Sequence, residues 1–360
     1  MSLPSRRLAV EDGPQLVLIV DDSAVARAML ASMLKASGRF EVVGTVPTAA
    51  AALKFLAANR VDFILLDIEM PGVDGLTALP GLAAAAPGAR IIVVSSAPAA
   101  GVQALAVGAA DALTKPGAGE LSAPFAKLLV NTLLRLKDAD LSVPQVAEPA
   151  PVIPLRTREQ AAPPRPGGDE YDMVAIGAST GGIHALGGML RELPSSFRVP
   201  ILVTQHLPAS FMPYFAAQLS LLAGRPCDVA TDRMRISPER LIVAPGDAHM
   251  MCVPLPGGGA AIRLSHEPAA SGCMPSVDPM LASAADVYGS RMLAVMLSGM
   301  GRDGTAGAGH AHAAGAAVVV QDRETSVVWG MPGSVVRAGL ADAVLAPEAI
   351  GRLAATCRRP

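Results

Sequence analysis

The sequence contains few aromatic residues and no long apolar run. Aromatic side chains make up 3% of its 360 residues, and the hydrophobic content of 51% comes mostly from alanine, valine and leucine. It has no uninterrupted run of about 18 apolar residues, the length that a membrane-spanning helix needs. The opening residues, MSLPSRRLAVEDG, lack the apolar segment of a signal peptide. We therefore expect a cytoplasmic protein with no membrane span.

An excess of positive charge is also missing. The net charge is −2 and the isoelectric point is about 6.3, so the chain offers no basic face for nucleic acid. No Cys-x-x-Cys pair and no histidine at zinc-finger spacing accompany the four cysteines, which are Cys227, Cys252, Cys273 and Cys357. We expect free thiols in a reducing cytosol rather than disulfides.

The length suggests two or three domains. From residue 16 to about residue 136, apolar strand-like runs alternate with alanine-rich helical runs, in five repeats. The strand-like runs are LVLIV, FEVVGTV, FILLD, IIVVSS and DALTK. Such alternation predicts an α/β fold with a doubly wound parallel sheet, in which ligands bind at the carboxyl ends of the strands.

Polar residues stand at those strand ends, namely Asp21, Asp22, Asp67, Ser95 and Lys115. Each could be an ordinary loop or surface residue, but polar residues at four strand ends of one sheet favour a functional site there. Clustered carboxylates are costly without a cation, and their hard oxygen atoms suit Mg²⁺. With its charge offset by the metal, Asp67 can attack a phosphoryl group, whose oxygens Lys115 and Ser95 are placed to hold.

The motifs VLIVDDS, FILLDIEMPGVDGL, VVSS and LTKP resemble the receiver domain of response regulators. The resemblance implies phosphorylation of Asp67 by a histidine kinase. It also implies Mg²⁺ bound by Asp22, Asp67 and the carbonyl of Glu69, with Asp21 in support. One position departs from the family pattern, because Ala112 stands where many receivers carry an aromatic residue that switches rotamer.

A proline-rich segment then separates two halves of the chain. Prolines between residues 138 and 170 prevent long helices, so we expect a semi-extended linker. The expected units are a receiver at 14–137, a linker at 138–170 and a second domain at 171–360. That second domain resumes the alternation, with strands expected in MVAIG, PILVT, LIVAPG, AAIRLS, RMLAVMLSG and AGAAVVVQ. A second parallel sheet is predicted.

The second domain begins with MVAIGASTGG, in which a strand ends at a glycine-flanked turn carrying Ser179. The serine could be a helix N-cap, and the glycines could form a dinucleotide loop, although the G-x-G-x-x-G pattern is incomplete. Two further strands end at His206 and Asp303. An imidazole can take the proton of a serine hydroxyl, and a carboxylate can orient that imidazole, so these residue types suffice for acyl transfer.

Each of these residues also has a structural interpretation. His206 could be a structural histidine before a turn, and Asp303 could cap a helix that starts near Gly304. Other histidines compete for the role of base: His184, His249, His266, His310 and His312. A metal pair of His310 and His312 is improbable because residues two apart do not share a helix face.

Six motifs of the second half, IGASTGG, TQHLP, LIVAPGDAHM, SVDPM, LSGMGRDG and WGMPGSVVRAGLAD, resemble the catalytic domain of the CheB protein-glutamate methylesterases. The resemblance implies Ser179 as nucleophile, His206 as general base and acid, and Asp303 as orienting carboxylate. The amides of Thr180 and Met300 are implied as oxyanion donors. The implied substrate is a glutamate γ-methyl ester on a chemoreceptor, with glutamine deamidation as a second activity and no cofactor for the esterase.

Two other classes of function stay open from the residues alone. A response regulator with a DNA-binding output would need a basic recognition helix, which this composition does not supply. A receiver joined to a non-catalytic, protein-binding output domain would keep the fold without turnover.

Overall fold

The computed structural model describes residues 13–115, 123–141 and 170–357. Its first part contains five strands and five helices: β1 (Gln15–Val20), α1 (Ala24–Ala36), β2 (Phe40–Val46), α2 (Ala49–Leu56), β3 (Phe63–Leu66), α3 (Gly75–Ala85), β4 (Arg90–Ser95), α4 (Pro98–Ala106), β5 (Asp111–Thr114) and α5 (Ala123–Leu141). All five strands are parallel, in the order β2-β1-β3-β4-β5. This order is that of flavodoxin-like folds.

The second part is larger. Its elements are β6 (Met173–Ala178), α6 (Gly182–Arg191), β7 (Ile201–Gln205), η1 (Ala209–Phe211), α7 (Met212–Ala223), β8 (Cys227–Val229), β9 (Leu241–Val243), β10 (His249–Pro254), β11 (Ala260–Ser265), α8 (Val277–Tyr288), η2 (Gly289–Arg291), β12 (Met292–Met296), α9 (Thr305–Ala313), β13 (Ala317–Gln321), α10 (Met331–Arg337), β14 (Ala343–Leu345) and α11 (Pro347–Ala355). Seven parallel strands form one sheet in the order β14-β13-β12-β6-β7-β9-β8.

The expected α/β class with two parallel sheets is confirmed, with one addition. The expected strand AAIRLS forms as β11, but it pairs antiparallel with β10 in a separate hairpin beside the main sheet. The central strands are continuously apolar because helices cover both faces of the sheet, as for β6 and β12, all of whose residues are buried. Strands β6, β7 and β12 are neighbours in this sheet, so their carboxyl ends lie at one edge.

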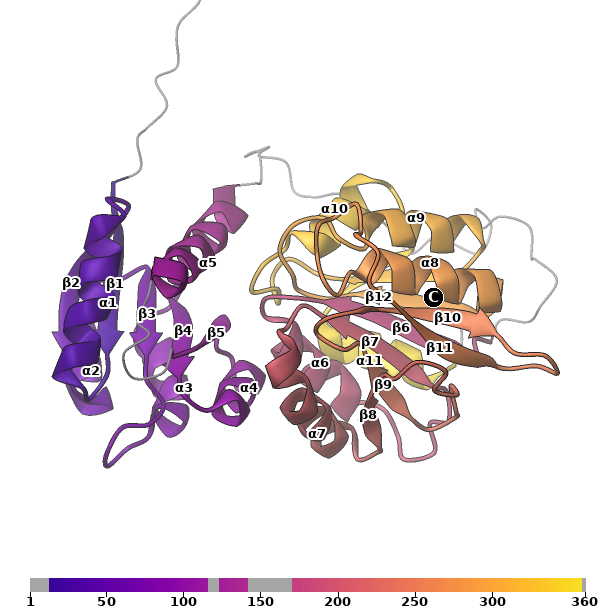
Figure 1. Cartoon of the computed structure of the whole chain (residues 1–360), viewed down its shortest axis with the longest axis horizontal. Coiled ribbons are helices and arrows are strands. Elements are labelled where there is room, and N and C mark those ends of the chain that lie inside the picture. Colours follow the sequence, from indigo (N-terminus) through magenta and orange to yellow (C-terminus); the bar gives the residue numbers. More distant parts are fainter. Residues whose placement is uncertain (1–12, 116–122, 142–169, 358–360) are drawn as a thin grey trace, which may run out of the picture.

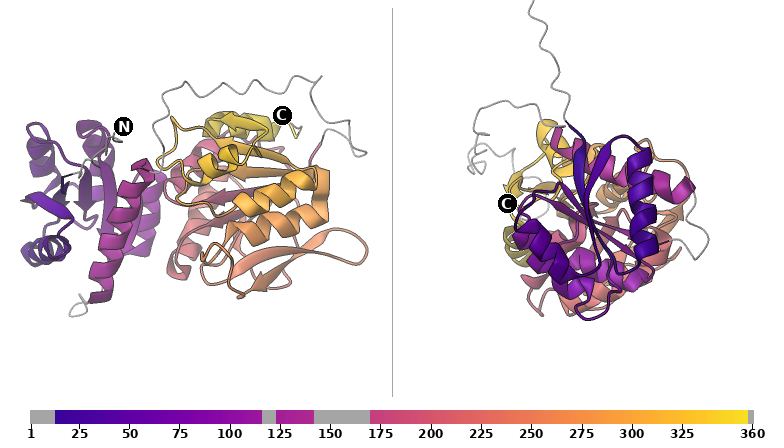
Figure 2. Two further views of the ribbon diagram at one scale, coloured as in Figure 1. Left: turned by 90° about the horizontal axis from the view of Figure 1, so that it is seen from above. Right: turned by 90° about the vertical axis from the view of Figure 1, so that its left-hand side faces the viewer.

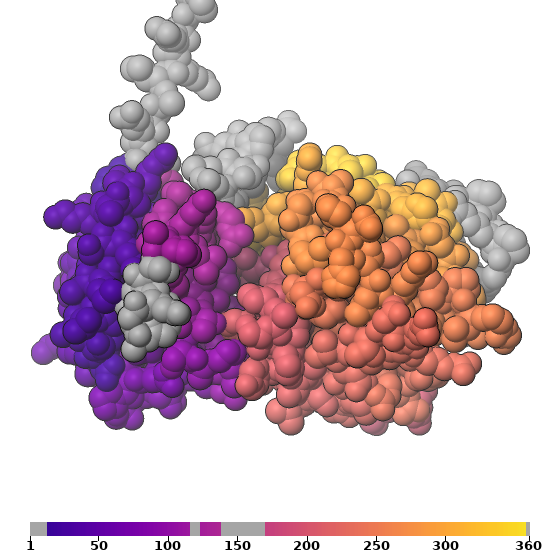
Figure 3. Space-filling model, in the orientation of Figure 1, coloured from indigo at the N-terminus to yellow at the C-terminus, as the bar shows by residue number. Residues whose placement is uncertain are grey.

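The two sheets belong to two lobes that touch along one face (Figures 1 and 3). Helix α4 of the first lobe packs against α6, α7 and η1 of the second. One buried apolar cluster includes residues of both lobes, among them Val102 and Leu105 of α4 and Phe211 and Phe215 of the second lobe. The His184 ring also hydrogen-bonds the Ala106 carbonyl across the boundary, over 3.2 Å. The view from above in Figure 2 (left) shows the first lobe set against one end of the second.

The limits of the domains at residues 137/138 and 170/171 stay predictions. Helix α5 runs to Leu141, and residues 142–169 of the expected linker lie outside the described residues. Among the described residues, no helix is both long and apolar enough to cross a membrane.

Candidate active site

Ser179 follows β6 directly, in the tight turn that leads into α6. Gly181 makes this turn possible: its φ is +76°, and a side chain there would meet Val327 and the Ser298 hydroxyl. The turn is fixed to the neighbouring strand end, because Ser179 N–H donates to the Ser298 carbonyl over 3.0 Å and Ser298 Oγ donates to the Thr180 carbonyl over 2.8 Å. Ser179 is therefore held in a rigid position at the edge of the sheet.

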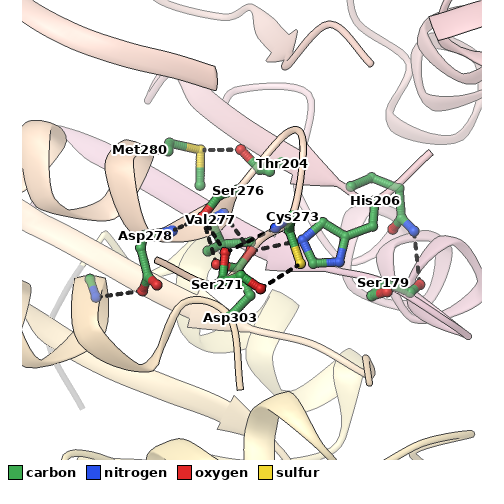
Figure 4. Close-up of polar contacts among 12 residues, drawn as sticks. Ser179, Thr204, His206, Ser271, Cys273, Ser276, Val277, Asp278, Met280 and Asp303 are labelled. Carbon is green, nitrogen blue, oxygen red and sulfur yellow. Dashed lines mark hydrogen bonds and ion pairs between the residues drawn. The ribbon is translucent and has the colours of Figure 1, made fainter. Parts of the chain in front are cut away.

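His206 comes directly after β7, one strand away from Ser179. Its Nε2 lies 2.8 Å from Asp303 Oδ2. Because this carboxylate accepts a hydrogen bond from Nε2–H, the neutral imidazole keeps its free lone pair on Nδ1. In Figure 4, Asp303 lies on one side of the His206 ring and Ser179 on the other. Among the described residues, the Ser179 hydroxyl makes no hydrogen bond.

Asp303 is almost fully buried and is held by two further donors. Ser276 Oγ donates to Oδ1 over 2.6 Å, and Val277 N–H donates to Oδ2 over 2.7 Å. Burial by itself raises the pKa of this carboxyl, but the hydrogen bonds from His206, Ser276 and Val277 outweigh it and hold the pKa well below its ordinary value of 3.8. The carboxylate is therefore ionised at neutral pH and can stabilise a positively charged imidazole.

The alternative role of Asp303 as a cap of the following helix is not what the structure shows. Gly304 occupies the N-cap position of α9 with no side-chain capping bond, and the Asp303 side chain instead binds the start of α8. Sequence reasoning did not assign Ser276 a role, although a serine directly before an apolar helix is a typical N-cap. Its hydroxyl does accept from Asp278 N–H, and it also donates to Asp303.

Thr180 and Met300 lie near Ser179. Both line the same cavity as Ser179, and neither backbone N–H donates a hydrogen bond within the described part of the chain. Gly299, the residue before Met300, approaches Ser179 so closely that a side chain there would lie 2.9 Å from the Ser179 Cβ atom. Two amides without acceptors next to a serine hydroxyl are suited to bind a developing oxyanion.

Ser179 and His206 line a cavity of about 570 Å³ that lies between the two lobes. The second lobe supplies one wall, including Gln205, Cys273 and the turn after Ser179. The first lobe supplies the other wall through α4, β5 and α5, with residues that include Leu105, Ala112, Thr114, Leu128 and Arg135. Access to Ser179 is therefore limited by the first lobe.

Two more side chains near Asp303 were not singled out from the sequence. Burial and the charge of Asp303 both raise the pKa of the Asp278 carboxyl. The hydrogen bond from Gly307 N–H lowers this pKa but does not outweigh them. Burial and the same Asp303 charge raise the pKa of the Cys273 thiol. Cys273 gave no signal in the sequence, because nothing there distinguishes it from three other scattered cysteines.

The competing histidines have other contacts. His249 is buried, with Nε2 near the Glu267 carbonyl at 2.9 Å and Nδ1 accepting from Ser276 N–H. His266 contacts the Asp247 carbonyl, and His310 pairs with Asp286. Only His206 among the described histidines pairs with the carboxylate of Asp303.

In the first lobe, the strand-end residues also converge. Lys115 Nζ lies 2.8 Å from Asp67 Oδ2 and 2.9 Å from Asp21 Oδ2, and both carboxylates are buried. Burial raises the pKa of Asp67 and is only partly offset by Lys115. Burial lowers the pKa of Lys115, but the hydrogen bonds and charges of Asp67 and Asp21 outweigh this and raise it overall.

Carboxylate oxygens of Asp21, Asp22 and Asp67 lie within 4.8 Å of one another, with Asp22 exposed at the surface. This all-oxygen set fits a hard divalent cation such as Mg²⁺. Glu69 follows closely, with its N–H donating to Asp67 Oδ1 over 3.2 Å. Ser95 is buried at the end of β4, where its hydroxyl accepts from Ala97 N–H.

The fold and site define a class: a flavodoxin-like phosphoacceptor lobe that partly encloses the serine, histidine and aspartate of a hydrolase-like lobe. Comparison with known families agrees with both halves. Residues 17–123 match the response regulator receiver domain, and residues 174–353 match CheB methylesterase. The chain belongs to the CheB methylesterase family.

Several relatives align with nearly the whole chain. A protein-glutamate methylesterase/protein-glutamine glutaminase of Caulobacter vibrioides is 39% identical over 93% of this chain and 96% of its own length. One of Azospirillum brasilense is 38% identical over 94% of this chain and 91% of its own. The crystal structure of the Thermotoga maritima CheB methylesterase catalytic domain is 36% identical and covers 52% of this chain and 98% of its own, with a TM-score of 0.50.

Proposed function

We propose that this chain is a phosphorylation-controlled serine esterase, which hydrolyses glutamate γ-methyl esters on chemoreceptors and deamidates glutamine at such sites. The observation that carries the proposal is the His206–Asp303 pair at 2.8 Å, which shares a cavity edge with Ser179 and the two free amides. The names of the relatives supply the substrate class. A non-catalytic output domain is not favoured, because the residues needed for acyl transfer stand together.

In the proposed mechanism, each residue carries out one step. His206 Nδ1 takes the proton of Ser179 Oγ, the oxygen attacks the ester carbonyl carbon, and the amides of Thr180 and Met300 bind the resulting oxyanion. The imidazolium, stabilised by Asp303, then gives its proton to the departing methoxy group, and methanol leaves. Water, activated by the same imidazole, hydrolyses the acyl-enzyme to glutamate. With glutamine as substrate, ammonia leaves instead of methanol.

The receiver would accept a phosphoryl group on Asp67 from a histidine kinase in the cytoplasm. Mg²⁺ would be held by Asp22, Asp67 and the Glu69 carbonyl, with Asp21 in support, and it would offset the negative charge that repels an anionic phosphodonor. Lys115 lies against Asp67 and can hold the phosphoryl oxygens, and Ser95 is placed at the next strand end. The esterase steps use only side chains and backbone amides of the second lobe.

The test is release of methanol from methylated chemoreceptors by the purified protein. Ser179→Ala should lower the rate by about 10³-fold or more, because the oxyanion donors cannot replace the attacking oxygen. Ser210→Ala is the matched control, since Ser210 lines the same cavity but has no assigned role in the chemistry. A folded Ser179→Ala variant that keeps more than about a tenth of the wild-type rate would exclude Ser179 as nucleophile.

A further inference from the structure

Three potential metal ligands meet at the wall of the catalytic cavity. His206, Cys273 and Asp303 each offer one ligand atom, and these three atoms lie within 4.8 Å of one another. They come from three separate segments: the end of β7, the loop before α8 and the loop after β12. Figure 4 shows the Cys273 sulfur beside the His206 ring, on the side of Asp303.

The loop that carries the thiol is tied to the carboxylate that completes the set. Cys273 N–H donates to Ser271 Oγ over 3.3 Å, and Ser271 Oγ donates to Ser276 Oγ over 3.2 Å. Ser276 Oγ in turn donates to Asp303 Oδ1 over 2.6 Å. This chain of bonds ties the backbone of Cys273 to Asp303, so a cation would meet ligands from segments that are already held together, which lowers the cost of ordering them.

The chemistry of the three ligands selects the cation. A thiolate, an imidazole and a carboxylate are the ligands of Zn²⁺, whereas Mg²⁺ and Ca²⁺ prefer oxygen alone. Cys273 is only partly buried and lines the cavity, so a cation can enter from it, and a water molecule can complete a tetrahedral set. Arg135 of α5 lines the same cavity and would oppose a cation, but a thiolate and the Asp303 carboxylate together carry more charge of the opposite sign.

We propose that the catalytic cavity carries an inhibitory site for a thiophilic divalent cation such as Zn²⁺, bound by Cys273, His206 and Asp303. Binding exchanges one proton of the thiol for the cation, and no oxidation or reduction takes place. If the metal binds Nε2 of His206, the single proton of the neutral ring lies on Nδ1. If the metal binds Nδ1 instead, it occupies the lone pair of that nitrogen. In both cases the imidazole cannot accept the proton of Ser179, so hydrolysis stops until the metal is removed.

Cobalt spectroscopy tests the site without using activity. With excess Mg²⁺ present to occupy the receiver carboxylates, Co²⁺ added to the full-length protein should give a near-ultraviolet thiolate-to-cobalt absorption band. The band should be lost in Cys273→Ser and Cys273→Ala, weakened in His206→Gln, and kept in Cys227→Ser, whose residue lies on β8 and does not line the cavity. Absence of the band from the wild type, or its persistence in both Cys273 variants, would overturn the proposal.

The claim that Zn²⁺ inhibits hydrolysis rests on the proposed function, and it is tested separately by methanol release. The methanol release of the wild type, Cys273→Ser and Cys227→Ser is compared in each case with the metal-free rate of the same protein while the free Zn²⁺ concentration is raised in a metal buffer. Because loss of an outer-shell partner of a metal site costs about 10–100-fold in affinity, loss of a ligand should shift the inhibition midpoint by at least about tenfold. Cys227→Ser should match the wild type, and a chelator should restore activity. An unshifted midpoint in Cys273→Ser would refute inhibition through this site, whereas absence of methanol release in every sample would instead refute the proposed function.

Discussion

At the scale of single residues, Asp303 connects His206 to the rest of the lobe. It accepts from His206 on one side and from Ser276 and Val277 on the other. The contact with Ser276, the N-cap of α8, cannot be inferred from the local sequence around Asp303, because Ser276 precedes Asp303 by 27 residues. The motif SVDPM was visible in the sequence, but which carboxylate its serine would contact depends on how α8 lies beside the loop after β12.

Ser276→Ala should slow hydrolysis without abolishing it. A hydrogen bond to a charged group contributes about 1.5–3 kcal/mol, so we expect a loss of about tenfold or more in methanol release, as Asp303 becomes less well oriented. Ser283→Ala is the control, because Ser283 lies on α8, the helix that Ser276 caps, and its hydroxyl accepts from Cys252 N–H rather than contacting Asp303. Equal rates in the two variants would show that Ser276 does not position the carboxylate.

The depressed pKa of Asp303 predicts how acid affects the second lobe. A carboxyl group whose pKa is lower in the folded state contributes stability that is fully present above its ordinary value of 3.8 and is lost as pH falls toward its folded value. The urea midpoint should therefore drop more between pH 6 and pH 3 in the wild type than in Asp303→Asn. Trp329, the single tryptophan, lies in this lobe and reports its unfolding by fluorescence. An equal drop in both proteins would contradict the assignment.

At the scale of elements, the long apolar strands could be predicted from the sequence, and they carry the site. Strands β6, β7 and β12 are buried runs that overlap the expected ones, although β6 and β7 each end one residue later than predicted and β12 ends three residues earlier, at Met296. Strands β8 and β14, of three residues each, are too short to show a pattern. The β10–β11 hairpin could not be separated from the main sheet, because apolar content does not reveal a strand's partner.

The packing of α4 against the second lobe gives a prediction about control. A Cβ atom added at Gly101 would lie 3.1 Å from the Phe211 ring and 3.4 Å from Ala112 Cβ, so Gly101→Val should weaken docking of the receiver. Overpacking costs about 1 kcal/mol or more, which corresponds to about a fivefold or greater rise in methanol release from the unphosphorylated protein.

Gly81→Val is the matched control for Gly101→Val. Gly81 lies inside α3, and a Cβ atom there would meet nothing within 4 Å, so this variant bears the same change in helix propensity without touching the second lobe. If both variants keep the wild-type rate, the contact at Gly101 does not restrain the esterase.

At the scale of the whole molecule, the receiver and the esterase share one cavity, and its outer wall is made by α4, β5 and α5. For a receptor helix to reach Ser179, we expect the receiver to move away from this wall. Ala112 lies in that wall and, being small, offers no aromatic rotamer switch, so we expect a signal from Asp67 to pass through Ser95 and the backbone after β4. A tenfold change in activity requires a difference of only about 1.4 kcal/mol in docking free energy between the two states.

We expect phosphorylation of Asp67 to uncover Ser179, and the methanol release rate measured before and after a small phosphodonor is added with Mg²⁺ tests this. The rate of the full-length protein should rise about tenfold, and that of Asp67→Asn should not change. A fragment of residues 170–360 should have the higher rate without the donor, and adding the donor should not change it. A fragment no faster than the unphosphorylated full-length protein would contradict occlusion by the receiver.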